Sequence, residues 1–144
     1  MNLKSLVVDS KSAWASYPGY PDFEIEIVNL SRKELQNLRK GCVTQKYSRK
    51  TRVTEEVLDE EKFVKQFTAK TVKNWKGLTF EILETLLLID TGSNSLDTEV
   101  PFSAENAQVL VTQSSEFDTW LNEVVFDLDN FRSKPTRGVV APSD

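Results

Sequence analysis

The sequence predicts an α+β fold in which a small N-terminal antiparallel sheet or hairpin is packed by about five α-helices, so that the protein is predominantly helical. Two observations lead to this prediction. Phe23, Ile25 and Ile27 alternate with two glutamates, which is the period of two expected for a strand with one buried face. Most of the chain after residue 30 instead has apolar residues at helical spacing, behind residues that typically cap helices.

The predicted strand region covers residues 5–30. Trp14 and Tyr17 precede the tetrapeptide at 18–21, in which two prolines and a glycine favour a turn. We therefore expect a hairpin or a three-stranded sheet. A sheet of this size needs helices over its apolar face.

The first helix is predicted to begin at Ser31, because Ser31 and Glu34 have the spacing of a capping box. Gly41 should end or loosen this helix. Residues 44–53 have little apolar periodicity and several basic side chains, which predicts a mobile loop or a frayed helix end.

A second helix is predicted over residues 59–75, with Asp59 as its N-cap and Gly77 as its stop. A short helix that is apolar nearly all round follows over 79–89. Residues 90–101 are rich in Gly, Ser, Asn and Asp and predict a loop.

Ser103 is predicted to cap a further short helix, and Ser115 to cap the last one. In the last helix an apolar stripe continues for four turns, from residue 117 to 131. Phe126 lies on the opposite, polar face of the helical wheel, so we expect it either to contact a partner or to lie under the N-terminal sheet.

The length of 144 residues fits one domain. We expect a single α+β domain over residues 1–131 and a flexible C-terminal tail over 132–144, where the apolar pattern stops.

The net charge of −4 hides an uneven distribution. Residues 31–76 hold thirteen basic and six acidic side chains, whereas residues 77–144 hold three basic and twelve acidic ones. The two regions could pack against each other within one chain. They could also serve docking or self-association through complementary patches, which speeds encounter.

The residue inventory excludes several classes of protein. There is no histidine, and Cys42 is the only cysteine, which excludes disulfide frameworks, zinc fingers and Cys/His or Ser/His catalytic pairs within one chain. The acids of the 90–99 loop do not have calcium-loop spacing. We therefore predict no metal, no cofactor and no enzymatic activity. No apolar run approaches the ~20 residues of a membrane span, so we expect a soluble intracellular protein.

A basic patch is predicted between residues 39 and 52, with Tyr47 among its cations. It consists of Arg39, Lys40, Lys46, Arg49, Lys50 and Arg52. Phosphate binding and base stacking need such residues, but a solvated loop has the same composition. Because the net charge is negative and no nucleic-acid motif is present, nucleic acid is an unlikely partner.

Several motifs occur in a distinctive order. The capped segment Ser-Arg-Lys-Glu-Leu at 31–35 follows the Trp-containing sheet region. Asn-Trp-Lys-Gly-Leu stands at 74–78, and Val-Pro-Phe-Ser-Ala-Glu-Asn-Ala stands at 100–107, before the last helix. Over residues 12–131 this order resembles the tail assembly chaperones of long-tailed (siphovirus-type) bacteriophages. The 23 residues between Gly77 and Pro101 are a longer connection than this family implies.

The resemblance implies a non-enzymatic, late protein of virion morphogenesis. Such a chaperone binds the tape measure protein in the host cell cytoplasm while the tail tube polymerises, and is not retained in the mature virion. It also implies a longer frameshifted form whose extension departs after Arg132, contact with the tail tube protein, and a possible homo-oligomer. The alternatives are a structural or connector component of the tail, and a nucleic-acid-binding module that uses residues 39–52.

Candidate partner-binding residues are apolar or aromatic: Phe126, Trp75, Leu78, Phe102 and Trp120. The last four lie on apolar arcs or where helices begin, which favours a core role for them over partner contact.

Overall fold

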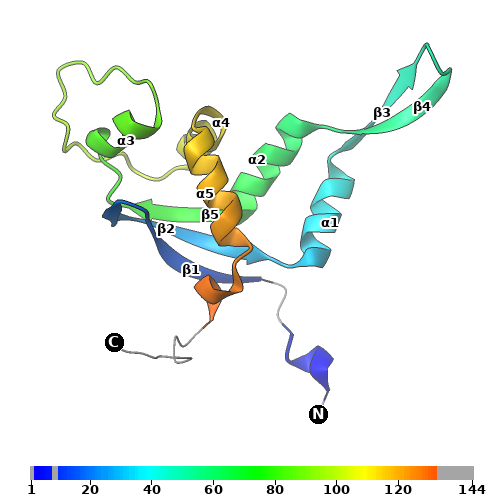
Figure 1. Ribbon diagram of the computed structural model, residues 1–144, viewed down its shortest axis with the longest axis horizontal. Coiled ribbons are helices and arrows are strands. Elements are labelled where there is room, and N and C mark those ends of the chain that lie inside the picture. The colour runs from blue at the N-terminus through cyan, green and yellow to red at the C-terminus, as the bar shows by residue number, and fades with distance from the viewer. Residues whose placement is uncertain (1, 8–9, 133–144) are drawn as a thin grey trace.

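The computed structural model describes residues 2–7 and 10–132 (Figure 1). Within these ranges helix accounts for 44% of the residues and strand for 29%. The fold is α+β, but the prediction of a predominantly helical protein was wrong, because residues 43–58 and 72–76 form strands that the helical interpretation had missed. The predicted tail from 133 to 144 lies outside the described residues.

The larger sheet has three antiparallel strands in the order β1-β2-β5. β1 (Ser10–Tyr17) and β2 (Tyr20–Leu30) form the predicted N-terminal hairpin, with Gly19 in the turn at φ +87°. β5 (Val72–Lys76) pairs with β2. The prediction that helix continues to residue 75 was therefore wrong. The helical spacing of Thr71 and Trp75 was coincidental, and pairing with β2 determines the strand.

One face of the sheet is covered by helices and the other is open (Figure 1). On β2, Phe23, Ile25 and Ile27 are fully buried on the helix side. On the open side, Lys76 lies 5.0 Å from the centroid of the Trp14 ring and 3.0 Å from Glu24 Oε1. The alternation seen in the sequence thus separates a core face from a solvent face.

The helices begin where the sequence indicates. Ser31 and Glu34 form the predicted capping box, and Asp59 and Ser103 cap the next predicted helices. The last helix begins one residue earlier than predicted, because Ser114 accepts the capping bond from the backbone N–H of Phe117. The helices are α1 (Arg32–Gly41), α2 (Glu60–Thr71), α3 (Phe80–Leu86), α4 (Ala104–Gln113) and α5 (Ser115–Val125).

A second, two-stranded sheet is formed by β3 (Val43–Ser48) and β4 (Val53–Leu58). This hairpin, which we call the arm, joins α1 to α2 and projects away from the rest of the molecule (Figure 1). The expectation of a mobile loop or frayed helix at 44–53 was therefore wrong. At the root of the arm, the backbone N–H of Asp59 donates to the carbonyl of Cys42 at 2.7 Å.

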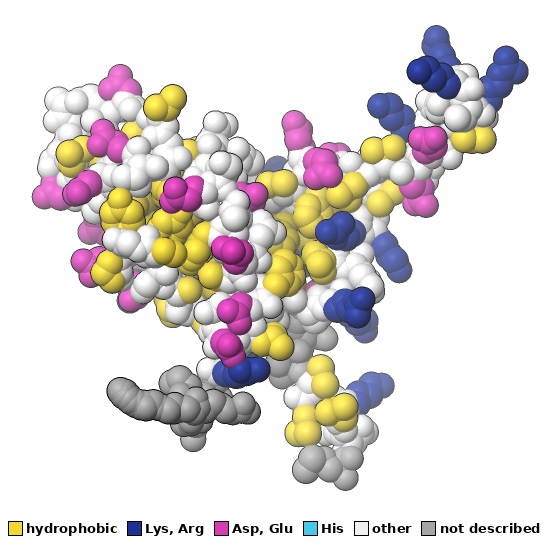
Figure 2. All heavy atoms as spheres, viewed as in Figure 1, with side chains coloured by type: hydrophobic (Ala, Val, Ile, Leu, Met, Phe, Trp, Pro, Cys, Tyr) yellow, Lys and Arg dark blue, Asp and Glu magenta, His cyan; other side chains and the backbone are white. Residues whose placement is uncertain are grey.

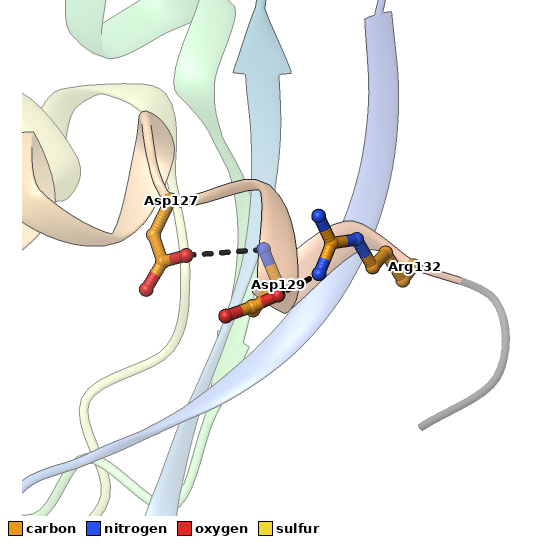
Figure 3. Close-up of polar contacts among 3 residues, drawn as sticks. All are labelled: Asp127, Asp129 and Arg132. Carbon is orange, nitrogen blue, oxygen red and sulfur yellow. Dashed lines mark hydrogen bonds and ion pairs between the residues drawn. The ribbon is translucent and has the colours of Figure 1, made fainter. Parts of the chain in front are cut away.

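The described chain ends in a short 3-10 turn, η2 (Leu128–Phe131), which buries Phe131 beside the core. Asp127 accepts a hydrogen bond from the backbone N–H of Asp129 at 3.0 Å, and Arg132 forms an ion pair with Asp129 (Figure 3). Both contacts are exposed and local, so they stabilise the turn and indicate no chemistry.

Candidate protein-binding surfaces

The two motifs around Trp75 and Phe102 lie side by side in the core. The indole N–H of Trp75 donates to the carbonyl of Val100 at 2.9 Å, and the Phe102 ring lies edge-on to Trp75 at 5.2 Å between centroids. The backbone N–H of Val100 donates to the carbonyl of Leu78 at 2.7 Å. These bonds join the two ends of the long connection between the motifs. Both motifs contribute side chains to the core.

Gly77 has a steric role within this region. Its φ is +79°, and a Cβ atom added there would lie 1.9 Å from the backbone oxygen of Asp22. Only glycine combines a positive φ with the absence of a side chain. Gly77 therefore lets the segment after β5 pass closely over the start of β2.

Most of the predicted partner-binding residues are not accessible. Trp75, Leu78 and Trp120 are buried, with exposed fractions of 5%, 1% and 8%. Phe102 is half-buried against the core. These four residues therefore have the core role that their position in the sequence favoured. Phe126 alone among the five predicted residues is exposed, at 41%.

α5 ends at Val125, sooner than its apolar stripe predicts. The side-chain amide of Asn29 donates to the carbonyl of Val125 at 2.7 Å, and that of Asn130 donates to the carbonyl of Val124 at 3.0 Å. These bonds satisfy carbonyls that a continued helix would use. The predicted helix through Phe131 was therefore wrong. Phe126 is the C-cap, and its ring lies beside that of Phe67 on α2.

Phe126 belongs to a row of aromatic rings that we call the aromatic strip. Its ring centroid lies 6.0 Å from that of Phe67, which lies 5.8 Å from that of Phe63. The guanidinium of Arg39 stands 5.3 Å from the centroid of the Phe63 ring. Hydrophobic side chains gather on this face between acidic groups over α5 and basic groups over α1 (Figure 2). Phe126 is thus the exposed end of the strip, Phe63 is half-buried and Phe67 is buried, and opposite charges lie on the two sides.

A second apolar surface lies beyond α3. Leu88 is fully exposed and Val109 on α4 is 47% exposed, and both line a shallow cavity of about 420 Å³. The sequence indicated an apolar segment here but placed it in a helix over 79–89. The structure ends that helix at Leu86, which leaves Leu88 in the following loop.

The predicted basic patch is divided between two elements. Arg39 and Lys40 occupy the last turn of α1, where positive charge complements the helix dipole. The other four cations, Lys46, Arg49, Lys50 and Arg52, lie on the arm. Figure 2 shows basic side chains crowding the far end of the arm.

The surroundings of Tyr17 perturb the pKa of its hydroxyl. Burial, and then its hydrogen bond to Glu116 at 2.6 Å, raise the pKa of the Tyr17 hydroxyl well above its usual value. The ring lies among Phe23, Phe117 and Trp120. A raised pKa keeps the hydroxyl protonated, so Tyr17 acts as a neutral donor and not as a base.

In the part of the chain that the structure describes, no three His, Cys, Asp or Glu residues gather into a group that could hold a metal ion. Cys42 is buried at the root of the arm, with its thiol 3.7 Å from Gln66 Oε1. None of the helices within residues 2–7 and 10–132 is long and apolar enough to cross a bilayer.

Comparisons with protein-family models, curated proteins and solved structures found no match to this chain. The surfaces of the molecule and the order of its motifs are therefore the observations that bear on its function.

Proposed function

We propose that the protein is a tail assembly chaperone of a long-tailed bacteriophage, which binds the tape measure protein and catalyses no reaction. The observation that carries the proposal is the aromatic strip. The motif order at 31–35, 74–78 and 100–107 supports it through the resemblance to that family. A chaperone of this kind needs an accessible apolar surface on a rigid support.

The aromatic strip has this character. Phe126 is exposed, while Phe67 beneath it is 4% exposed and held in the core. Aromatic side chains, Phe included, are enriched at protein interfaces. An amphipathic client helix could place its apolar face on the exposed end of the strip and its charged flanks toward α5 and α1.

The proposal extends to location and partners. The chaperone would act in the host cell cytoplasm during assembly and would be absent from mature virions. Its other proposed partners are the tail tube protein and a longer frameshifted form of itself.

Co-expression with the tape measure protein tests the client site. Phe126→Ser should reduce the amount of client that co-purifies by at least about tenfold, because an interface anchor contributes roughly 2 kcal/mol. The same change should lower the melting temperature by only about 3 °C, since one ring contact with Phe67 is lost.

Leu88→Ser is the matched control, because it also removes an exposed apolar side chain but lies outside the strip. Client recovery should be unchanged in this variant. Loss of client with Leu88→Ser and not with Phe126→Ser would move the client site to the α3 loop and contradict the assignment to the strip.

Mass spectrometry of purified virions tests the role itself. A chaperone should be missing from mature particles. Abundant copies of the chain in virions would instead identify it as a structural or connector component of the tail.

A further inference from the structure

The arm is a weakly supported part of the described molecule. Its two strands hydrogen-bond only with each other, and no residue between 43 and 58 is buried. An isolated two-stranded hairpin is marginally stable in water, and its outer edges leave backbone N–H and C=O groups without strand partners. An element of this kind gains stability when a partner covers it.

The end of the arm carries the chemistry that a partner would meet. Residues 46–54, which we call the tip, hold four cations and no acid. Tyr47 and Val53 are 60% and 52% exposed. Neither of the two ion pairs found among the described residues involves a tip cation. The tip therefore offers unpaired positive charge beside apolar surface.

A groove of about 490 Å³ between α2, α4 and α5 has the complementary character. We call it the acidic groove, and its lining residues are Glu60, Glu61, Val64, Val111, Thr112 and Asp118. The two valines provide an apolar floor, and the three carboxylates take part in neither of those two ion pairs.

A second groove beside Tyr17 is also lined by acids, namely Glu116 and Glu123, but it fits the tip less well. Glu116 already accepts the hydrogen bond of the Tyr17 hydroxyl. The acidic groove has more carboxylates, and its apolar floor matches Tyr47 and Val53.

We propose that the arm of one copy of this chain docks on a second copy, with the tip in the acidic groove. The geometry favours a reciprocal, two-fold dimer. The groove starts at the root of the arm, because Glu60 directly follows Asp59, which is bonded to Cys42. Two arms that lie antiparallel and edge to edge place each tip at the root of the other. A two-fold contact of this kind closes on itself.

The contact approaches the size of a standard interface. On each copy it takes in the nine tip residues, the rest of one edge strand of the arm and the six residues that line the groove. A standard interface uses roughly 20–30 residues on each side. Pairing of the arm edges would also satisfy backbone groups that water alone now solvates.

A second copy fits the arm better than nucleic acid does. Glu55 and Glu56 follow the tip on β4 and place negative charge on both faces of the arm, and the chain as a whole has a net charge of −4. A phosphate backbone would be repelled by these groups, whereas the acidic groove attracts the tip alone.

The oligomeric state of the purified full chain tests the proposal. Light scattering after size-exclusion chromatography should give twice the chain mass of 16.4 kDa. Because the contact is electrostatic at its ends, raising the salt from about 50 mM to about 500 mM should weaken the dimer.

Charge reversal at the tip, with Arg49→Glu, Lys50→Glu and Arg52→Glu together, should weaken dimerisation by at least roughly tenfold. The matched control reverses three exposed cations that lie outside the tip and the groove, with Lys4→Glu, Lys33→Glu and Lys70→Glu, and gives the same net charge. This control should remain a dimer.

Reversal of the groove, with Glu60→Lys, Glu61→Lys and Asp118→Lys, should also give monomers. Mixing the tip variant with the groove variant should restore a dimer. At one contact the reversed tip meets the reversed groove, and at the other the unchanged tip meets the unchanged groove, so both contacts join opposite charges. A variant that had merely failed to fold could not be rescued in this way, and circular dichroism of each variant alone checks its fold.

Three results would overturn the proposal. They are a monomeric wild-type chain at low salt, a tip variant that dimerises as well as its control, and reversed variants that stay monomeric when mixed. Salt-sensitive binding of a monomeric wild-type chain to a DNA or RNA oligonucleotide, lost in the tip variant, would assign the arm to nucleic acid instead. None of these results depends on the tape measure protein, so the dimer and the chaperone role can fail separately.

Discussion

The protein contains two antiparallel hairpins with opposite surroundings. The β1–β2 hairpin is part of the core, and Phe23, Ile25 and Ile27 on β2 are fully buried beneath helices. The β3–β4 arm buries none of its residues, and only Val43, Ser48 and Leu58 are even half-buried. The backbone pairing is the same in kind, so the difference lies in what covers each hairpin.

This difference explains why one hairpin can be recognised in the sequence and the other cannot. Burial of one strand face selects apolar residues at every second position. The arm has no buried face and therefore no such selection, so its sequence reads as polar and basic. A strand pair without this alternation has no buried face, so it is held weakly by the rest of the molecule and would gain stability from a binding partner.

The largest expected contrast is in core packing. Ile25→Ala should lower the free energy of unfolding by about 3 kcal/mol, since it removes a fully buried side chain from β2. Val57→Ala on the arm should change it by less than about 0.5 kcal/mol, because Val57 is 39% exposed. Urea denaturation of both variants measures the contrast. Equal effects would mean that the arm is packed in solution, and the comparison of the two hairpins would then be wrong.

The next expected effect concerns Gly77, which lies over the start of β2. Gly77→Ala should destabilise the protein by about 3 kcal/mol, from the positive φ and from the clash with the carbonyl of Asp22. Gly92→Ala is the control, because Gly92 has a φ of +62° but no atom near the added Cβ. Its effect should be about 1 kcal/mol. A Gly77 variant as stable as the Gly92 variant would show that the close approach to Asp22 relaxes at little expense.

Local chemistry predicted much of this fold. The capping box at Ser31, the N-caps at Asp59 and Ser103 and the first hairpin all depend on neighbouring residues, and all were confirmed. β5 depends on a partner strand more than forty residues away. Its Trp75 also satisfied the helical pattern, so the local signal favoured the wrong element.

The candidate site was less predictable, because exposure is set by the whole fold. Phe126 was singled out by its place on the helical wheel, although α5 ends before it. Asn29 and Asn130 bind the carbonyls at the end of α5, so Phe126 is the C-cap and not a residue of a helix face. The acidic groove combines side chains from three helices, and no spacing in the sequence could indicate it.

A smaller effect is expected where the first hairpin meets α5. Tyr17→Phe should lower stability at neutral pH by about 1 kcal/mol, because the hydrogen bond to Glu116 is lost. The folded chain raises the pKa of the Tyr17 hydroxyl above its ordinary value of 10.0. That contribution is therefore fully present below pH 10 and declines as the pH rises above 10.

Denaturation of wild type and Tyr17→Phe at several alkaline pH values measures this decline. The two proteins should differ most below pH 10 and converge above it. A difference that stays constant through pH 11 would contradict the raised pKa of Tyr17.

The smallest expected effect is confined to the arm. Arg52 closes the turn of the arm at a φ of +59°, and its N–H donates to the carbonyl of Ser48 at 2.7 Å. Arg52→Gly relieves roughly 1 kcal/mol of left-handed backbone strain, partly offset by the greater freedom of glycine when unfolded. Amide exchange in β3 and β4 should therefore slow by about twofold, while exchange in β1 and β2 stays unchanged, because weakly supported elements open separately from the core.

Arg52→Ala separates this backbone effect from the loss of charge, because alanine removes the guanidinium but keeps the strained φ. It should not slow exchange in the arm. Amide exchange should be measured at high salt and low protein concentration, because self-association would otherwise slow exchange at the edges of the arm. If Arg52→Gly slowed exchange in β1 and β2 as well, both hairpins would open as one unit. The arm would then be part of the cooperative fold, and a partner would not be needed to order it.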